Sequence, residues 1–202
     1  MTLEEGVAAL GLELPEGAND RLLKYASLIE KWNRVYNLTA IRGMEKIVSH
    51  HLLDSLSVLP HIEANSCADV GSGAGLPGIP MAIARPGMDV ALIESNSKKA
   101  AFLVQASIEL GLPNVSVFAE RVENLKGKKF DLVISRAFSE IGEFARLAMP
   151  LYCKGGRLAA MKGQYPEEEL AGLPPGVAVE KIVPLKVPGL EGERHLVIMN
   201  LE

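Results

Sequence analysis

Cysteine, net positive charge and long hydrophobic runs are all scarce in this sequence, and each shortage excludes a class of protein. Two cysteines, Cys67 and Cys153, occur without Cys-x-x-Cys or His-rich spacing, so we expect reduced thiols rather than a disulfide scaffold or a metal site. The formal net charge is −4. This argues against a surface coated in positive charge but permits a local basic face.

The lack of long hydrophobic runs argues against a membrane protein. The longest uncharged stretch around the glycine-rich segment, residues 70–84, is interrupted by Pro77 and Pro80, whereas a membrane-spanning helix needs about 20 apolar residues. The chain opens on an acidic segment, residues 1–5, where a secretory signal would be basic. We therefore expect a cytoplasmic protein with no membrane contact and one well-buried core.

The first 60 residues read as helices. Thr2 fits a capping box, and Gly11 can end the short helix that it starts. Asp20 can cap a longer helix, in which apolar residues recur every three or four positions up to Tyr36. A third helix is expected over residues 44–59, stopped by Pro60.

From residue 66 on, short apolar runs alternate with helical segments, which indicates a parallel sheet with helices on both faces. The expected strands are residues 66–70, 89–94, 115–119, 130–135, 157–161, 177–184 and 194–201, the last two as an antiparallel pair. The expected helices are residues 78–85, 97–110, 139–151 and, near the end, 167–170. We divide the chain into a helical extension, residues 1–62, and one compact α/β core, residues 63–202.

The most informative segment, residues 68–78, reads Ala-Asp-Val-Gly-Ser-Gly-Ala-Gly-Leu-Pro-Gly. Glycines at this spacing let the backbone turn sharply at a strand end and approach a ligand closely, because no Cβ intervenes. A second acid, Glu94, ends the next apolar run 23 residues after Gly71. That is about the distance at which a βαβ unit places a carboxylate on a ribose. The sequence therefore predicts a nucleotide-like cofactor.

Two cofactors compete for this segment. Residues 73–78 satisfy Gly-x-Gly-x-x-Gly, so a nicotinamide dinucleotide stays open, as does a tight loop without a ligand. Three features favour S-adenosylmethionine. Asp69 precedes the first glycine by two residues, and the expected C-terminal hairpin replaces a second mononucleotide-binding half. Pro77 fits the first turn of a helix and leaves fewer amide donors for a pyrophosphate.

Several further motifs accompany the glycines. They are Trp-Asn at 32–33, Tyr-Asn-Leu-Thr at 36–39, His-His-Leu-Leu-Asp-Ser at 50–55, the extension to Ile-Pro at 79–80, Arg-Val-Glu at 121–123 and Ile-Ser-Arg-Ala-Phe at 134–138. With them the chain resembles, over nearly its whole length, the bacterial 16S (small-subunit) ribosomal RNA guanine-N7 methyltransferases (RsmG, also called GidB). The resemblance implies a Rossmann-like, class I fold dependent on S-adenosylmethionine: a seven-stranded, mostly parallel sheet with an antiparallel C-terminal hairpin and added N-terminal helices.

The resemblance also implies a cofactor site. It assigns loop contacts to Gly71 and Leu76, ribose contacts to residues 94–96, adenine contacts to residues 122–123, and a further contact to Arg136. These positions follow predicted strands, where ligands bind in doubly wound sheets. With the other loop residues, the predicted cofactor site consists of Asp69, Gly71, Gly73, Gly75, Leu76, Glu94, Ser95, Asn96, Val122, Glu123 and Arg136.

The segment after the fourth strand shows which methyl-transfer chemistry is absent. Ser135-Arg136-Ala137-Phe138 cannot supply the [Asn/Asp]-Pro-Pro-aromatic motif used on exocyclic amines, and neither cysteine is placed as a nucleophile. Guanine N7 already carries a lone pair, so no general base is assigned, and Arg136 is left as the one catalytic candidate. Arg136 can hold a cofactor carboxylate or phosphate, or form a salt bridge that fixes its loop. Phe138 can stack on the base or pack in the core.

The expected partner is ribosomal RNA in an assembled or partly assembled small subunit, with no DNA or membrane, and the protein is expected to be a monomer. About half of its candidate basic side chains should contact phosphate. The RNA-binding candidates are Arg34, Arg42, Lys98, Lys99, Arg121, Lys162 and, by stacking, Phe138. No metal is expected, because the adjacent His50 and His51 point about 100° apart on a helix.

Three other functions remain open on sequence grounds. One is a small-molecule S-adenosylmethionine-dependent methyltransferase, with the N-terminal helices as a lid. Another is a non-catalytic protein of ribosome assembly that binds S-adenosylmethionine or RNA. The third is a nicotinamide-dependent oxidoreductase, and the composition alone excludes none of them.

Overall fold

A single seven-stranded sheet organises the computed structural model, which describes residues 1–136, 138 and 140–201. Its strand order is β3-β2-β1-β4-β5-β7-β6; β1 to β5 are parallel, and β7 is antiparallel to both β5 and β6. The strands are β1 Ser66–Val70, β2 Asp89–Ile93, β3 Val115–Phe118, β4 Phe130–Ser135, β5 Tyr152–Lys162, β6 Val177–Pro184 and β7 His195–Leu201. The predicted fold class is confirmed.

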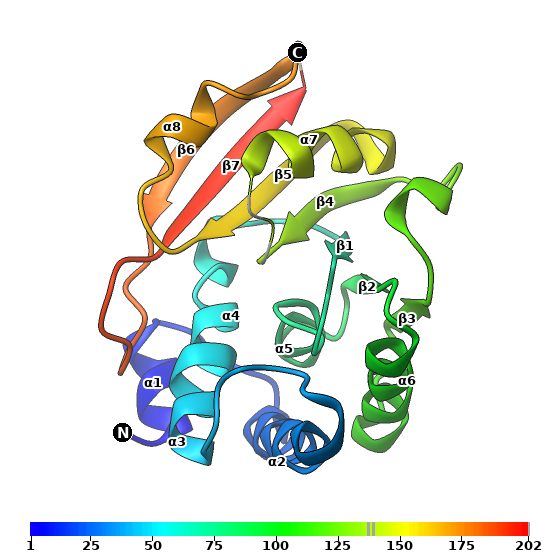
Figure 1. The fold of residues 1–202 in the computed structure, drawn as a ribbon. Helices are drawn as coiled ribbons and strands as arrows, with labels where there is room; N and C mark the ends of the chain where they lie inside the picture. Colours follow the sequence, from blue (N-terminus) through cyan, green and yellow to red (C-terminus); the bar gives the residue numbers. More distant parts are fainter. Residues whose placement is uncertain (137, 139, 202) are drawn as a thin grey trace.

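Helices cover both faces of this sheet (Figure 1). The N-terminal helices pack with α5 and α6 in one hydrophobic cluster below the sheet, and α7 anchors a second cluster above it. The α-helices are α1 Leu3–Ala9, α2 Ala18–Tyr36, α3 Met44–Ile47, α4 Asp54–Leu56, α5 Gly78–Ala84, α6 Ser97–Leu110, α7 Ile141–Ala148 and α8 Glu167–Leu170. The shorter turns are η1 Val48–Leu53, η2 Leu59–His61, η3 Val122–Asn124 and η4 Met149–Leu151. The division at residue 62 stays a prediction, although both parts contribute to the lower cluster.

The N-terminal helices differ from expectation in two places. The capping box at Thr2 is present, but α2 begins at Ala18 behind Gly17, whose φ is 72°, so the prediction that Asp20 caps this helix was wrong. The third helix starts at Met44 as expected and then widens into the π-helical turn η1 before continuing as α4. A π-turn inserts one extra residue per turn and often marks a functional site.

The fifth strand is longer than the sequence suggested. It begins at Tyr152 rather than at residue 157, and the Gly155-Gly156 pair lies inside it. Gly155 has a φ of 83°, and the register with β4 shifts between Phe130 and Leu132. The glycines therefore make an irregularity within a strand, a common use of φ > 0. Within the described part of the chain, no helix has the length and apolarity to cross a membrane.

Candidate functional site

The glycine-rich loop follows β1 at the edge where the parallel strands end, the usual ligand-binding edge of such a sheet. Gly71, Gly73 and Gly75 have φ values of 70°, 60° and 88°, a region that residues with a Cβ rarely adopt. Gly78 is needed for a different reason. A Cβ there would lie 2.3 Å from Leu92 Cδ2 and 2.8 Å from Asp69 Oδ2.

Asp69 fastens this loop to the helix that follows it. Its side chain is fully buried, and Oδ2 accepts a hydrogen bond from the Gly78 amide at 2.9 Å. Oδ1 has no hydrogen-bond partner among the described residues. Burial raises the pKa of Asp69 to about 7, although the Gly78 hydrogen bond and the charge of Arg136 act in the opposite direction. Asp69 therefore supports the loop from inside, and its predicted contact with the cofactor stays a prediction.

Glu94 connects the loop to the next strand–helix unit. It is 7% exposed at the end of β2. Its Oε2 accepts a hydrogen bond from the Gly73 amide at 2.8 Å, and its Oε1 accepts one from the Asn96 amide at 2.7 Å. The Asn96 side chain caps α6 by accepting from the Lys98 and Lys99 amides, while Ser95 is exposed. Hydrogen bonds thus join Asp69 and Glu94, the acids near the ends of β1 and β2, to the glycine-rich segment.

The remaining cofactor candidates lie in two environments. Val122 is buried and Glu123 exposed on the short turn η3, which follows the edge strand β3. The Leu76 side chain belongs to the lower hydrophobic cluster, so a ligand would meet its backbone rather than its side chain. The ligand contacts of these residues stay predictions.

Arg136, at the end of β4, contacts the widened helical turn. Its Nη1 donates to the His50 carbonyl oxygen and to Asp54 Oδ2, each at 3.1 Å. The same guanidinium lies 3.3 Å from His51 Nδ1, and His51 Nε2 lies 2.8 Å from Thr39 Oγ1. Of the two interpretations of Arg136, the salt bridge is present in the structure, and the cofactor contact stays a prediction.

The sequence analysis missed three residues that support the site, which are Tyr25, Asp54 and Arg194. The Tyr25 hydroxyl donates to the Ala74 carbonyl oxygen and so holds the glycine loop from the helical side. Asp54 lies between two arginines, because Arg194 Nε is 3.3 Å from its Oδ1. Tyr25 lies among the regularly spaced apolar residues of α2, so helical periodicity does not distinguish it. A polar hydroxyl that must find a partner when buried is the signal that could have singled it out.

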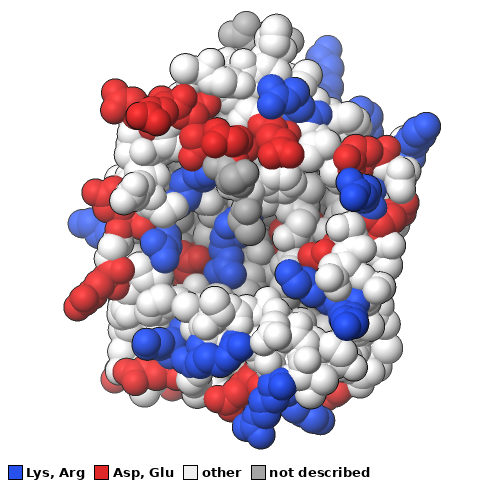
Figure 2. All heavy atoms as spheres, in the orientation of Figure 1, with Lys and Arg blue, Asp and Glu red and all other residues white. Residues whose placement is uncertain are grey.

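The basic candidates do not form a single patch. Lys162 forms an ion pair with Glu169 at 2.7 Å and donates to the Phe138 carbonyl oxygen. Arg34 and Arg42 line a cavity of about 200 Å³ between α2 and the segment that leads into α3, and Arg42 also donates to Asn37 Oδ1. Lys98 and Arg121 are exposed and Lys99 is half-buried. In Figure 2, acidic side chains form a band over the upper part of this face, and both basic and acidic ones lie around its hollowed centre.

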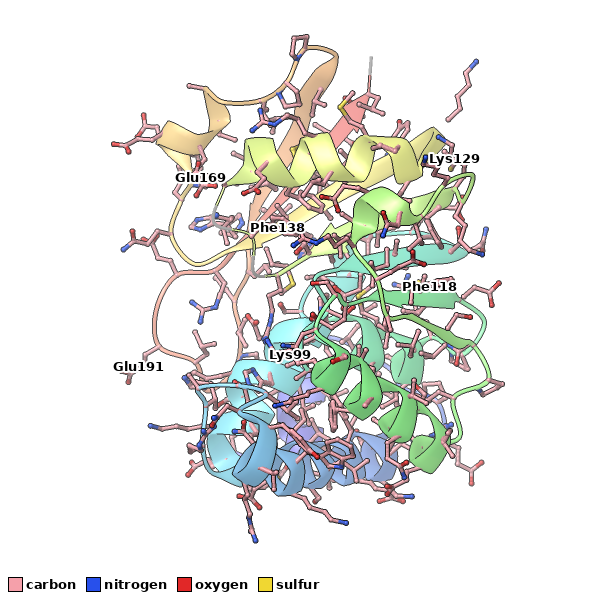
Figure 3. All side chains as sticks on the ribbon, turned by 45° about the vertical axis from the view of Figure 1, so that its right-hand side comes forward. Lys99, Phe118, Lys129, Phe138, Glu169 and Glu191 are labelled. Carbon is pink, nitrogen blue, oxygen red and sulfur yellow. The ribbon has the colours of Figure 1, made fainter. Side chains whose placement is uncertain are left out.

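Phe138 lies between the glycine loop and α7. Figure 3 shows it between the end of β4 and α7, with Lys99 across from it at the start of α6. Its ring centroid is 5.7 Å from that of Phe144, and a Cβ on Gly71 would lie 3.6 Å from its Cε2. Both stacking on a base and core packing are compatible with this half-buried position. Ala137, the third residue of the Ser-Arg-Ala-Phe run, lies outside the described residues.

We expect His51 to stay neutral throughout the physiological pH range. Burial and the adjacent charge of Arg136 lower its pKa from 6.5 to about 4. As the pH falls, the unfolded chain therefore takes up this proton at a higher pH than the folded chain does. The stability contributed by neutral His51 is lost as the pH falls from about 6.5 to 4. A ring-proton NMR titration should give a midpoint near 4. His51→Gln should make the unfolding free energy less dependent on pH over that interval. A midpoint near 6.5 would contradict this account.

Metal-binding geometry is absent from the described part of the chain: no group of three or more His, Cys, Asp or Glu side chains could hold an ion there. Cys67 and Cys153 are both free thiols, in agreement with the sequence. The site is thus built from glycines, two acids and an arginine network.

Comparison with known proteins places the chain in a family. A family model described as rRNA small subunit methyltransferase G (GidB) matches residues 18–197. "Ribosomal RNA small subunit methyltransferase G" of Nitrosospira multiformis is 55% identical over 98% of this chain and 95% of its own length. The protein of the same name from Chromobacterium violaceum is 54% identical over 99% of this chain and 97% of its own.

Solved structures show the same fold at low sequence identity. TrmN from Thermus thermophilus superposes with a TM-score of 0.60 at 18% identity, covering 84% of this chain and 53% of that one. The ribosomal protein L11 methylase from Lactobacillus delbrueckii gives 0.57 at 13% identity, covering 80% and 81%. With the glycine loop, the Glu94 bridge and the full-length relatives in agreement, the chain belongs to the rRNA small subunit methyltransferase G family.

Proposed function

We propose that the chain transfers a methyl group from S-adenosylmethionine to N7 of a guanosine in 16S ribosomal RNA of the small subunit. The observation that carries the cofactor assignment is the buried carboxylate of Glu94, which is held by two backbone amides against the glycine loop. A carboxylate at the end of β2 suits the hydroxyl groups of a ribose. The names of the relatives support the ribosomal substrate.

The proposed reaction needs positioning more than acid–base chemistry. The N7 lone pair attacks the methyl carbon, and the carbon–sulfur bond breaks in line, so that the sulfonium becomes a thioether and the guanine ring gains the positive charge. No proton leaves N7. Alignment of the two reactants can then supply most of the rate enhancement. Asp69, the carboxyl with a pKa near 7, is enclosed behind Gly78 and is not needed as a base.

The acceptor is proposed to be an assembled or partly assembled small subunit rather than naked RNA. The net charge of −4 and the acidic band of Figure 2 would weaken binding to bare RNA, because phosphate contacts supply most non-specific affinity. Folded RNA that presents one guanosine can instead use a few local basic side chains. We propose that the protein acts as a monomer in the cytoplasm.

A labelling experiment tests this proposal. Small subunits that lack the modification are incubated with the protein and S-adenosylmethionine that carries a tritiated methyl group. We expect label in small-subunit RNA and none in large-subunit RNA. S-adenosylhomocysteine should raise the melting temperature while NAD leaves it unchanged. Stabilisation by NAD, or a lack of label in any RNA, would contradict the proposal.

A further inference from the structure

A hollow of about 350 Å³ opens beside Arg136, at the ends of β4 and β5. Its walls come from five separate parts of the chain: the loop before α3, the π-helical turn with the start of α4, the end of β4, the end of β5 and the residue before β7. The lining includes His50, Asp54, Arg136, Lys162, Gly163 and Arg194. Figure 2 shows basic side chains, together with acidic ones, around the centre of this face. Its composition is unusually rich in cationic side chains for a protein of net negative charge.

A single buried carboxylate forms ion pairs with two guanidinium groups in this hollow. Asp54, whose side chain is 4% exposed, contacts Arg136 Nη1 through Oδ2 at 3.1 Å and Arg194 Nε through Oδ1 at 3.3 Å. One carboxylate offsets one guanidinium, so the trio retains one positive charge. The Lys162 charge is offset by Glu169. The hollow therefore keeps a local positive charge in a partly desolvated place, where charges interact more strongly than in water.

Fold stability alone gives no reason for this arrangement. A buried ion pair contributes little net stability, because desolvation of the charges cancels most of their attraction. Both guanidiniums also remain partly accessible, with the Arg136 side chain 21% exposed and that of Arg194 29% exposed. Fixed, planar N–H groups that still face solvent match the oxygens of a phosphate. The half-buried ring of His50 lines the same hollow.

We propose that this hollow binds one backbone phosphate of the RNA strand that carries the methyl acceptor. The inference rests on the proposed function. The hollow lies over β4, β5 and β7, and its lining contains no residue of the glycine loop, the Glu94 segment or the Val122 turn. Arg136 is the one predicted cofactor residue that lines it, and the other cofactor candidates lie outside its lining. A phosphate held there anchors the RNA and leaves the neighbouring nucleotide free to reach the cofactor.

The methylation kinetics of Arg194→Ala on small subunits that lack the modification test the proposal. We expect the KM for subunits to rise about tenfold and kcat to stay within about twofold. The slope of log KM against log salt concentration should decrease by about the amount due to one phosphate contact. Stabilisation by S-adenosylhomocysteine should be unchanged. Arg157→Ala is the matched control, because Arg157 also pairs with a carboxylate, Glu180, but outside this hollow. Arg194→Gln, which removes the charge but keeps a polar side chain of three carbons, is measured in parallel in case the alanine variant folds poorly.

Inorganic phosphate provides a readout that does not depend on methylation. Titration of the wild type should shift the NMR signals of the His50 ring and the Arg194 Nε–H, and Arg194→Gln should abolish the His50 shift. Unchanged KM and salt dependence in folded variants would overturn the proposal. So would a loss of S-adenosylhomocysteine binding, which would assign the hollow to the cofactor. If the wild type methylates nothing, the proposed function fails, and the phosphate titration still decides whether the anion site exists.

Discussion

Gly75→Ala is expected to destabilise the chain by about 3 kcal/mol and to lower its melting temperature by about 6–12 °C. Two costs add at this position. The φ of 88° is unfavourable for any residue with a Cβ, and the new methyl group would lie 2.6 Å from Ile79 Cδ1 and 2.9 Å from Leu103 Cδ2. Both side chains are fully buried, so they have little room to move. Thermal unfolding measures the effect directly.

Gly73→Ala is the matched control, because it isolates the cost of crowding. Gly73 also has a positive φ, 60°, but the nearest atom to its added Cβ would be a backbone oxygen 3.9 Å away. Only the backbone cost remains there, about 1 kcal/mol, or 2–4 °C. Equal melting temperatures for the two variants would show that the loop is loosely packed, contrary to the structure.

Glu94→Ala is expected to weaken S-adenosylhomocysteine binding on the order of 100-fold. The variant removes a charged acceptor for the ribose hydroxyls. It also leaves the Gly73 and Asn96 amides without the carboxylate that accepts from them at 2.8 and 2.7 Å. The loop and the start of α6 then lose their shared anchor, which should also cost about 2 kcal/mol of stability. Calorimetric titration and thermal unfolding separate the two effects.

Glu109→Ala serves as the control at the other end of α6, where the Glu109 carboxylate accepts from the Gln105 side chain. Its binding of S-adenosylhomocysteine should equal that of the wild type. Glu94→Gln should lie between the wild type and the alanine variant, since an amide can still accept one of the two bonds. Wild-type affinity in Glu94→Ala would remove Glu94 from the cofactor site.

The sheet was predictable because its strands are short apolar runs separated by clear breakers. Strands β1, β4 and β6 have the bounds that the apolar runs indicated, and β2 and β3 each end one residue earlier. β5 was the exception, because a Gly-Gly pair in sequence looks the same whether it makes a turn or an irregularity inside a strand. The difference depends on hydrogen bonds to β4, which local sequence does not encode.

The helical part shows where periodicity is insufficient. Residues 44–59 carry apolar side chains at helical spacing, yet one stretch is π-helical, because a widened turn changes the hydrogen bonds without changing the pattern of hydrophobic residues. That turn determines how His50, His51 and Asp54 meet Arg136. The glycine loop and Glu94 were predictable from their spacing. The Asp54 link between Arg136 and Arg194 depends on tertiary contacts and was not.

Mass analysis of nucleosides tests the central claim most directly. Small subunits that lack the modification are incubated with the protein and S-adenosylmethionine, and their RNA is then digested to nucleosides. The account predicts that N7-methylguanosine appears, that it is absent when S-adenosylmethionine is omitted, and that its rate of formation falls sharply with Glu94→Ala. A different methylated nucleoside would contradict the assignment of N7. The absence of any new methylated nucleoside would contradict the enzymatic function itself.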